Sequence, residues 1–282
     1  MRHFEQGDFV QGEFAYRDLN LVVRRYGDPA ARPDARSYLL VHGIGVSARY
    51  FVKLIEQLRP HGIVYTVDMP GFGSAQPKPR RALSIEDLAE LILAFADEWN
   101  IRNPVLVGHS MGTQIVVEMA IRNPGISDCL VLIGPVVDPA APSAVRQGFR
   151  LLRDVFMEPP GSNWIVFTDY LKCGPRWYLT ALPAMLSYRM EERLPLLTAF
   201  TLVIRGQRDP VAPGDWVEGM TRALLRPGRF EAPRAPHVAQ YAAAPAVGEA
   251  ILAHVEAAAA GNGLEHGLSG RQGISPGGGP AQ

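Results

Sequence analysis

Short apolar runs alternate along this chain with longer stretches in which the apolar residues recur at helical spacing. Gly, Pro, Asn or Asp residues bound most of the short runs, which is typical of buried strands. We predict eight strands, over residues 12–16, 19–25, 37–41, 63–67, 104–107, 129–133, 200–204 and 229–232. We predict the clearest helices over residues 50–58, after Ser84, from Ser110 to just before Pro124, and over residues 217–225 and 244–260. Ser84 and Asp87 fit a capping box at the start of the second of these.

Strands that alternate with helices form parallel β-α-β units, so the fold class is α/β with a doubly wound, mostly parallel sheet. The first two strands resemble a hairpin and give the sheet an antiparallel edge. The alternation breaks after about residue 140, where a helical, aromatic-rich segment follows. We therefore expect a core in two parts, over residues 1–139 and 197–260, and an inserted helical cap over residues 140–196. The Gly-rich tail of residues 261–282 is expected to be disordered.

The charge and the cysteine content exclude several classes of function. The chain has 28 Lys and Arg residues and 28 Asp and Glu residues, so it lacks the surplus of cations that nucleic-acid binding needs. Cys129 and Cys173 cannot form a disulfide framework, and no Cys/His spacing is typical of a metal site. We expect no cofactor. The start of the chain lacks the pattern of a signal peptide and no apolar run is long enough to span a membrane, so we expect a cytoplasmic protein.

The strongest chemical signal is Gly108-His109-Ser110-Met111-Gly112, which fits G-x-S-x-G between a buried strand and an apolar helix. A serine on such a tight turn holds its hydroxyl above the sheet, where it can act as a nucleophile. The same turn directs the Met111 amide at any oxyanion that forms there. The alternative interpretation is a serine that only caps the helix.

A nucleophilic serine needs a base, and the base needs an acid that orients it. Of the seven histidines, His237 follows the last strand and comes late in the chain. Asp209 follows the preceding strand, which gives the order Ser, Asp, His. Asp138, just after the strand over residues 129–133, is the competing candidate for the acid. For the second oxyanion donor we nominate the backbone amide of Ile44, in the glycine loop after the strand over residues 37–41.

Taken together, His42-Gly43 and its loop, Asp68 to Gly73, the serine turn, Asp209 and His237 resemble the α/β-hydrolase fold superfamily, in its serine-nucleophile, carboxylesterase-like branch. The resemblance covers about residues 12–260. It implies an eight-stranded sheet, a helical cap between the sixth and seventh strands, and hydrolysis of ester-like bonds. Epoxide hydrolases and haloalkane dehalogenases of this fold have an aspartate where this chain has Ser110. Carbon–carbon bond hydrolases often have a tryptophan after the base, where this chain has Val238.

The aromatic residues of the cap indicate an apolar pocket over the serine, and therefore a small to medium apolar substrate. The residues expected to line this pocket are His42, His109, Phe156, Trp164, Phe167, Tyr170 and Val238. The aromatic residues would also be present if they only packed the cap on the core.

Other functions stay open beside ester hydrolysis. The same machinery serves cleavage of 1,3-diketone carbon–carbon bonds and acyl transfer, and a member of this fold can also bind a ligand without catalysis. The motif Gly43-x-Gly45-x-x-Ala48, with Asp68 at the end of the next strand, fits a dinucleotide-binding turn. The sequence does not indicate the oligomeric state.

Overall fold

A computed structural model of the chain describes residues 3–6, 9–137 and 160–261. Asp138 and Phe156 lie outside these residues, as do the first part of the predicted cap and all but the first residue of the predicted tail. All statements about the structure below refer to the described residues.

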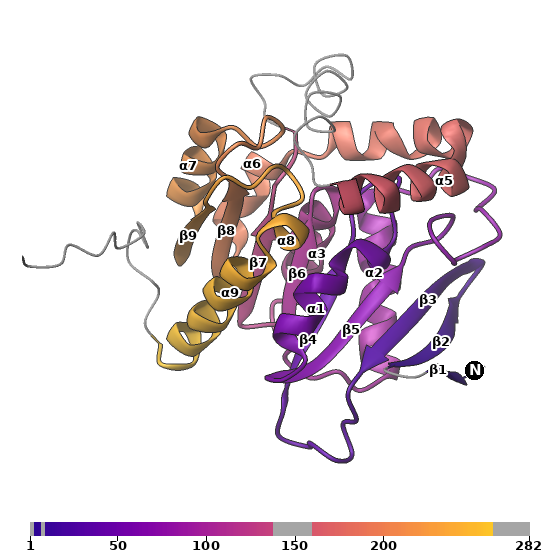
Figure 1. Cartoon of the computed structure of the whole chain (residues 1–282), viewed down its shortest axis with the longest axis horizontal. Helices are drawn as coiled ribbons and strands as arrows, with labels where there is room; N and C mark the ends of the chain where they lie inside the picture. Colours follow the sequence, from indigo (N-terminus) through magenta and orange to yellow (C-terminus); the bar gives the residue numbers. More distant parts are fainter. Residues whose placement is uncertain (1–2, 7–8, 138–159, 262–282) are drawn as a thin grey trace, which may run out of the picture.

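One mixed sheet of nine strands forms the centre of the molecule (Figure 1). The strands are β1 (His3–Gln6), β2 (Phe9–Tyr16), β3 (Leu19–Tyr26), β4 (Arg36–Val41), β5 (Gly62–Asp68), β6 (Val105–His109), β7 (Cys129–Ile133), β8 (Phe200–Gly206) and β9 (Pro227–Ala232). Their order across the sheet is β1-β2-β3-β5-β4-β6-β7-β8-β9. Neighbours from β5 to β9 pair in parallel, and β1, β2 and β3 extend the sheet antiparallel to β5.

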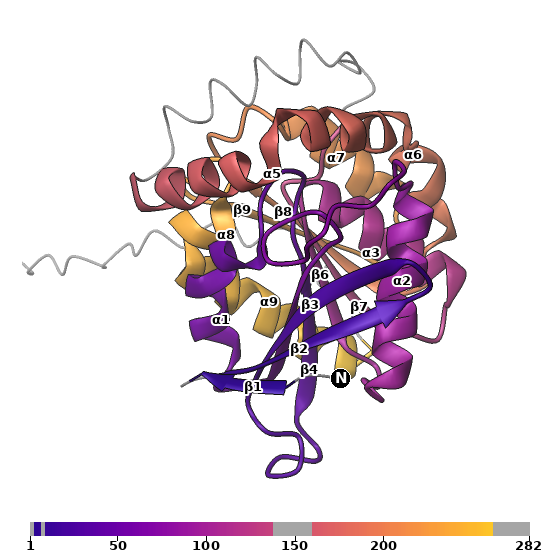
Figure 2. The same cartoon turned by 90° about the vertical axis from the view of Figure 1, so that its right-hand side faces the viewer.

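Helices cover both faces of this sheet (Figure 2). The helices of the described residues are η1 (Ala48–Phe51), α1 (Val52–Leu58), α2 (Ile85–Glu98), α3 (Met111–Arg122), α5 (Pro160–Ser187), α6 (Met190–Arg193), η2 (Leu194–Leu196), α7 (Gly214–Ala223), α8 (Ala239–Ala242) and α9 (Ala244–Ala259). Helices α2, α3 and α7 pack on one face, and α1, α8 and α9 on the other. This is the doubly wound arrangement that the alternating pattern predicted.

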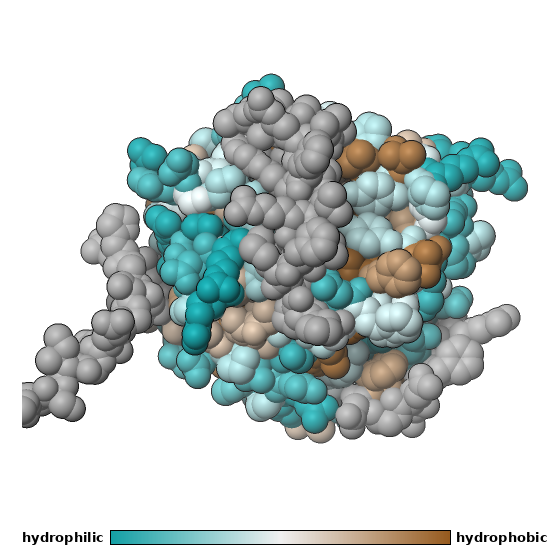
Figure 3. Space-filling view, turned by 45° about the horizontal axis from the view of Figure 1, so that its top comes forward, coloured by the Kyte–Doolittle hydropathy of each residue, from teal (hydrophilic) through white to brown (hydrophobic). Residues whose placement is uncertain are grey.

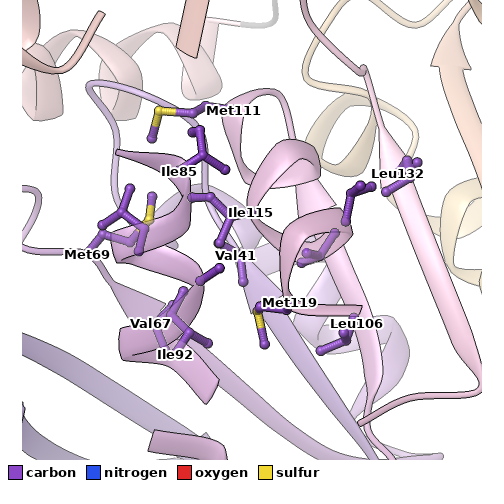
Figure 4. Packing of buried hydrophobic residues seen from close by; sticks show 14 of the residues in the cluster. Val41, Val67, Met69, Ile85, Ile92, Leu106, Met111, Ile115, Met119 and Leu132 are labelled. Atoms are coloured by element: carbon purple, nitrogen blue, oxygen red, sulfur yellow. The ribbon is translucent and has the colours of Figure 1, made fainter. Parts of the chain in front are cut away.

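The strand residues divide between two apolar cores, because successive side chains of a strand point to opposite faces. In β4, Leu39 and Val41 join the core under α2 and α3, whereas Tyr38 and Leu40 join the core under α1 and α9. Figure 4 shows Ile115 of α3 near Val41 in the first of these cores. A central sheet buried on both faces holds the ends of its strands, and the loops that follow them, in fixed positions.

The predicted α/β fold is confirmed, and its mostly parallel sheet gains one strand. The sequence did not predict β1, because His3–Gln6 is short and has no alternation of apolar residues. It pairs antiparallel with β2 at the edge of the sheet. The helix after Ser84 starts with the predicted capping box, in which the Ser84 and Asp87 side chains each accept a hydrogen bond from the other residue's backbone amide.

Between β7 and β8 the chain leaves the sheet and forms α5, α6 and η2. Helix α5 breaks at Gly174, whose φ of 68° and ψ of 149° are not helical and which precedes Pro175. Two close contacts place α5 on the loops after β4 and β5. A methyl group added at Gly45 would lie 2.3 Å from the ring of Tyr170, and one added at Gly71 would lie 2.4 Å from Nε1 of Trp177. Helix α5 therefore lies over the carboxyl ends of central strands.

In the described part of the chain, no helix is both long enough and apolar enough to cross a lipid bilayer. The His, Cys, Asp and Glu side chains of this part also form no group of three or more that could hold a metal ion.

Candidate active site

Ser110 occupies the turn between β6 and α3 in a strained backbone conformation. Its φ of 55° and ψ of −123° lie in a region that side-chain-bearing residues rarely adopt. The Ser110 amide donates to the Ile133 carbonyl over 3.0 Å, and the Ser110 carbonyl accepts from the Thr113 amide over 2.9 Å. These bonds hold the residue above the strand ends, as the G-x-S-x-G motif predicted.

The two glycines of the motif are needed because backbone crowds around the turn. A Cβ at Gly112 would lie 2.1 Å from the Val41 carbonyl oxygen, and one at Gly108 would lie 2.4 Å from the Gly112 carbonyl oxygen. The loop after β4 comes equally close on the other side, because a Cβ at Gly43 would lie 2.9 Å from Cβ of Ser110. Ser110 is thus enclosed by the end of β4 and the start of α3.

His237 and Asp209 form a buried pair at the ends of the neighbouring strands. The Nδ1 atom of His237 lies 2.9 Å from Oδ2 of Asp209, and only 4% of His237 and 3% of Asp209 are exposed. The other carboxylate oxygen of Asp209 accepts the amides of Val211 and Ala212 at 2.7 and 3.0 Å. Burial alone would raise the pKa of Asp209, but His237 and these amides lower it below its ordinary value, so the carboxylate stays ionised.

Gly134, directly after β7, lets this pair approach the serine turn. Its φ is 54°, and a Cβ there would lie 2.8 Å from the His237 ring and 3.4 Å from Oδ2 of Asp209. Ser110 is hydrogen bonded to Ile133, the last residue of β7, and the His237–Asp209 pair lies against Gly134, the next residue, so both are held at the same end of β7.

A chain of hydrogen bonds connects the loop after β4 with the backbone of His237. The Gly43 amide donates to the Tyr50 hydroxyl over 2.9 Å, and that hydroxyl lies 2.7 Å from Nδ1 of His109. The His237 carbonyl oxygen, 3.2 Å from Nε2 of His109, can only accept a hydrogen bond, so a neutral ring carries its proton on Nε2 and its Nδ1 accepts from the Tyr50 hydroxyl. Burial first, and then the nearby His237, lower the pKa of His109 well below its ordinary value, so this ring is neutral.

His42 and Asp68 fix the loops that surround the site. His42 is fully buried, with Nδ1 2.7 Å from the Gly43 carbonyl oxygen, and its Nε2 accepts the Met69 amide over 3.1 Å. Burial is the main cause of its lowered pKa. Asp68 accepts from the amides of Ala48 and Ser74 and pairs with Arg24. A carboxylate occupied in this way cannot bind a ribose, which argues against the dinucleotide-binding alternative.

The other predicted site residues differ in position. Met111 begins α3, so its amide is one of the first-turn donors that have no partner within the helix. Ile44 lies in the loop against Ser110 and is buried, as is Val238 next to His237. Trp164 and Phe167, however, are 68% and 55% exposed on α5. Such exposure contradicts the pocket position that the sequence predicted for them, because helical spacing alone does not show which face of a helix packs on the core.

Sequence reasoning missed three residues around the site. Tyr50 joins two loops through its hydroxyl, and Gly134 makes room for His237, but neither belongs to a motif. Asp169 of α5 is buried, accepts a hydrogen bond from Ser47 over 2.6 Å and pairs with Arg49. Its one signal in the sequence is that it is the sole acid among the residues of α5.

Comparison with known proteins agrees with this geometry. The model of the alpha/beta hydrolase family matches residues 38–261, which is most of the chain. This chain belongs to the alpha/beta hydrolase family. Membership in the family agrees with the doubly wound, mostly parallel sheet described above.

Individual relatives of the family resemble parts of this hydrolase-family chain. It is 31% identical over 111 residues to the uncharacterized hydrolase YugF of Bacillus subtilis. This aligned segment covers 39% of this chain and 41% of that protein. It is 32% identical over 95 residues to a pimeloyl-[acyl-carrier protein] methyl ester esterase of Pectobacterium carotovorum, covering 34% and 35%. The matched segments thus span less than half of these relatives.

One solved structure resembles almost the whole fold. The esterase of Thermogutta terrifontis superposes with a TM-score of 0.75 at 20% identity, over 88% of this chain and 98% of that one. A likeness at this level of identity shows the shared fold.

Proposed function

We propose that this protein is a serine hydrolase that cleaves an ester-like bond of a small to medium apolar substrate. The observation that supports this most is the position of Ser110, held by a strained turn next to the buried His237–Asp209 pair. A serine that only capped the helix would need neither this backbone conformation nor the buried His237–Asp209 hydrogen bond beside it, and its side chain makes no capping hydrogen bond among the described residues.

In the proposed reaction, Oγ of Ser110 attacks the substrate carbonyl and its proton passes to Nε2 of His237. Asp209 holds the other ring nitrogen and stabilises the imidazolium that forms. The amides of Ile44 and Met111 bind the oxyanion. His237 then gives its proton to the leaving alcohol, which departs and leaves an acyl-serine. Water attacks the acyl-serine with His237 as the base, and this releases the acid and restores the hydroxyl.

The segment over residues 140–196 acts in this proposal as a cap over the site. Tyr170 reaches Gly45, one residue after the proposed oxyanion donor, and Val238 follows the base. We assign these two side chains to the substrate pocket. We assign His42 and His109 to its inner wall, and since both nitrogens of each ring have contacts within the protein, these nitrogens do not bind the substrate. No cofactor is needed, and the cytoplasmic location stays a prediction.

A panel of p-nitrophenyl esters tests the proposal. Each methylene that enters the pocket adds up to ~0.8 kcal/mol of binding, so kcat/KM rises from acetyl to butyryl or hexanoyl esters and falls for long chains. Ser110→Ala lowers kcat by roughly 10³-fold or more. Ser187→Ala, at an exposed serine of α5, is the matched control and leaves kcat unchanged.

Two further measurements separate the alternatives. A fluorophosphonate labels the wild type and not Ser110→Ala, because only an activated serine reacts; a protein that binds its ligand without catalysis is not labelled. Product analysis with an added alcohol distinguishes acyl transfer from hydrolysis, and a 1,3-diketone tests carbon–carbon cleavage. Near wild-type turnover in Ser110→Ala would show that the proposed mechanism is wrong.

A further inference from the structure

Helix α5 exposes large apolar side chains on its outer surface. The described part of the chain exposes seven large hydrophobic side chains, and four of them belong to α5. These four form what we call the α5 stripe: Trp164 (68% exposed), Phe167 (55%), Leu171 (66%) and Leu179 (64%). Figure 3 shows hydrophobic side chains gathered on the face of the molecule that carries α5.

The first three residues of the α5 stripe share one face of the helix. Trp164, Phe167 and Leu171 follow one another at spacings of three and four residues, which places them one above the other. The Trp164 and Phe167 ring centroids are 6.4 Å apart. The opposite side of the helix packs on the protein, where Asp169, Cys173 and Trp177 are buried. These three side chains therefore form a continuous apolar surface, and Leu179 follows in the part of α5 after the break at Gly174.

Three exposed cations lie on or beside α5 in the described part of the chain. Lys172 and Arg176 of α5 are exposed, and a methyl group added at Gly174 would lie 3.5 Å from Nζ of Lys78, which is exposed too. None of these three cations forms an ion pair with another described residue. Asp169, the one acid of the helix, is buried and paired. This cationic patch contrasts with a chain whose charges balance overall.

We propose that the α5 stripe binds the surface of an anionic lipid bilayer. Exposed aromatic and leucine side chains flanked by Lys and Arg are the combination that enters the boundary between head groups and acyl chains. Anionic head groups would neutralise Lys78, Lys172 and Arg176. A second copy of this chain fits less well, because a symmetric contact through α5 would bring the same three cations of both copies together. The contact is peripheral and places the helix that covers the proposed active site at the membrane.

Vesicle binding of the full chain tests this proposal. We expect sedimentation with vesicles of phosphatidylcholine that contain about a third phosphatidylglycerol, and little with phosphatidylcholine alone; the loss of each cation lowers the partition coefficient about fivefold. Trp164 supplies a direct signal, because it is the one exposed residue among the chain's four tryptophans: Trp177 and Trp216 are buried and Trp99 is half-buried. Its emission shifts to the blue on binding, and Trp164→Phe removes most of the shift while binding persists.

Substitutions at exposed positions distinguish binding through the α5 stripe from non-specific adsorption through any exposed apolar side chain. Phe167→Ser and Lys172→Gln lower binding to the anionic vesicles, and raised salt lowers it further. The matched control is Leu225→Ser, since Leu225 is 65% exposed outside α5, and it leaves binding unchanged. Thermal melts check that each variant is folded. The assay measures partition in Ser110→Ala as well as in the wild type, so it does not depend on the proposed hydrolysis.

Three results would overturn the proposal. One is equal binding to vesicles with and without phosphatidylglycerol. Another is equal loss of binding in Phe167→Ser and Leu225→Ser. The third is sedimentation equilibrium that shows a dimer which Phe167→Ser dissociates, because the stripe would then be the contact between two copies.

Discussion

Replacing Tyr50 with phenylalanine removes one hydroxyl from the hydrogen-bond chain that joins Gly43, Tyr50, His109 and His237. The ring stays, so its edge-to-face contact with His109, with centroids 5.1 Å apart, is kept. What is lost is the acceptor for the Gly43 amide and the donor to Nδ1 of His109. Both groups are buried, and the phenylalanine offers neither of them a partner.

The size of the effect follows from these two groups. A buried polar group that loses its partner costs ~1–3 kcal/mol, so the Tyr50→Phe variant should lose about 2–6 kcal/mol of unfolding free energy. Turnover also falls, because Gly43 precedes the proposed oxyanion donor Ile44 and His109 supports the backbone of His237. Misalignment worth ~1.4 kcal/mol in the transition state lowers kcat about tenfold.

Urea unfolding and ester hydrolysis on the same preparations measure the two effects. Tyr38→Phe is the matched control, because Tyr38 is equally buried but its hydroxyl is not part of this chain of hydrogen bonds. We expect Tyr50→Phe to lose clearly more stability and more kcat than the control. Equal losses in the two variants would refute the view that this chain of hydrogen bonds holds the site together.

Two further predictions concern the acid and the response to pH. Asp209→Asn should lower kcat by about 10⁴-fold by allowing the wrong tautomer of His237, whereas Asn at the exposed Asp215 should change little; similar rates in the two variants would move the acid elsewhere. Burial lowers the pKa of His254, so below about pH 6.5 the unfolded chain binds a proton that the folded chain does not, and stability falls as the pH falls. His254→Phe should therefore lose stability less steeply between pH 7 and pH 5, by up to ~1.4 kcal/mol per pH unit, and an unchanged slope in urea unfolding would contradict this.

The sequence was sufficient to predict the fold class, because the core strands have a clear apolar pattern. Runs such as Cys129–Ile133 are apolar throughout, and this is typical of strands buried on both faces. His3–Gln6 was missed for the opposite reason: a four-residue edge strand with a single apolar residue depends on pairing with β2, which the sequence alone does not show.

The residues of the candidate site also divide into those that the sequence predicted and those that it did not. The positions of Ser110 and of the His237–Asp209 pair could be predicted because each follows a recognisable strand, and parallel strands end at one edge of the sheet. Tyr50, Gly134 and the burial of Asp169 could not, since each acts through a contact with a residue distant in the chain. The exposure of Trp164 was hidden too, because aromatic residues at helical spacing are equally typical of a packed and an open face.

The two faces of α5 connect the proposed surface contact with the proposed active site. On the inner face, Asp169 bonds to Ser47 and Tyr170 contacts Gly45, so the helix is fixed to the loop that carries Ile44. On the outer face, Trp164 and Phe167 are exposed and available to the proposed lipid bilayer. Helix residues three to four positions apart move together, because backbone hydrogen bonds join each turn to the next. If the proposed bilayer contact displaces the outer face of α5, the inner face moves with it, and so does the loop beside Ser110. The same apolar side chains on a flexible loop would not couple the bilayer to the site in this way.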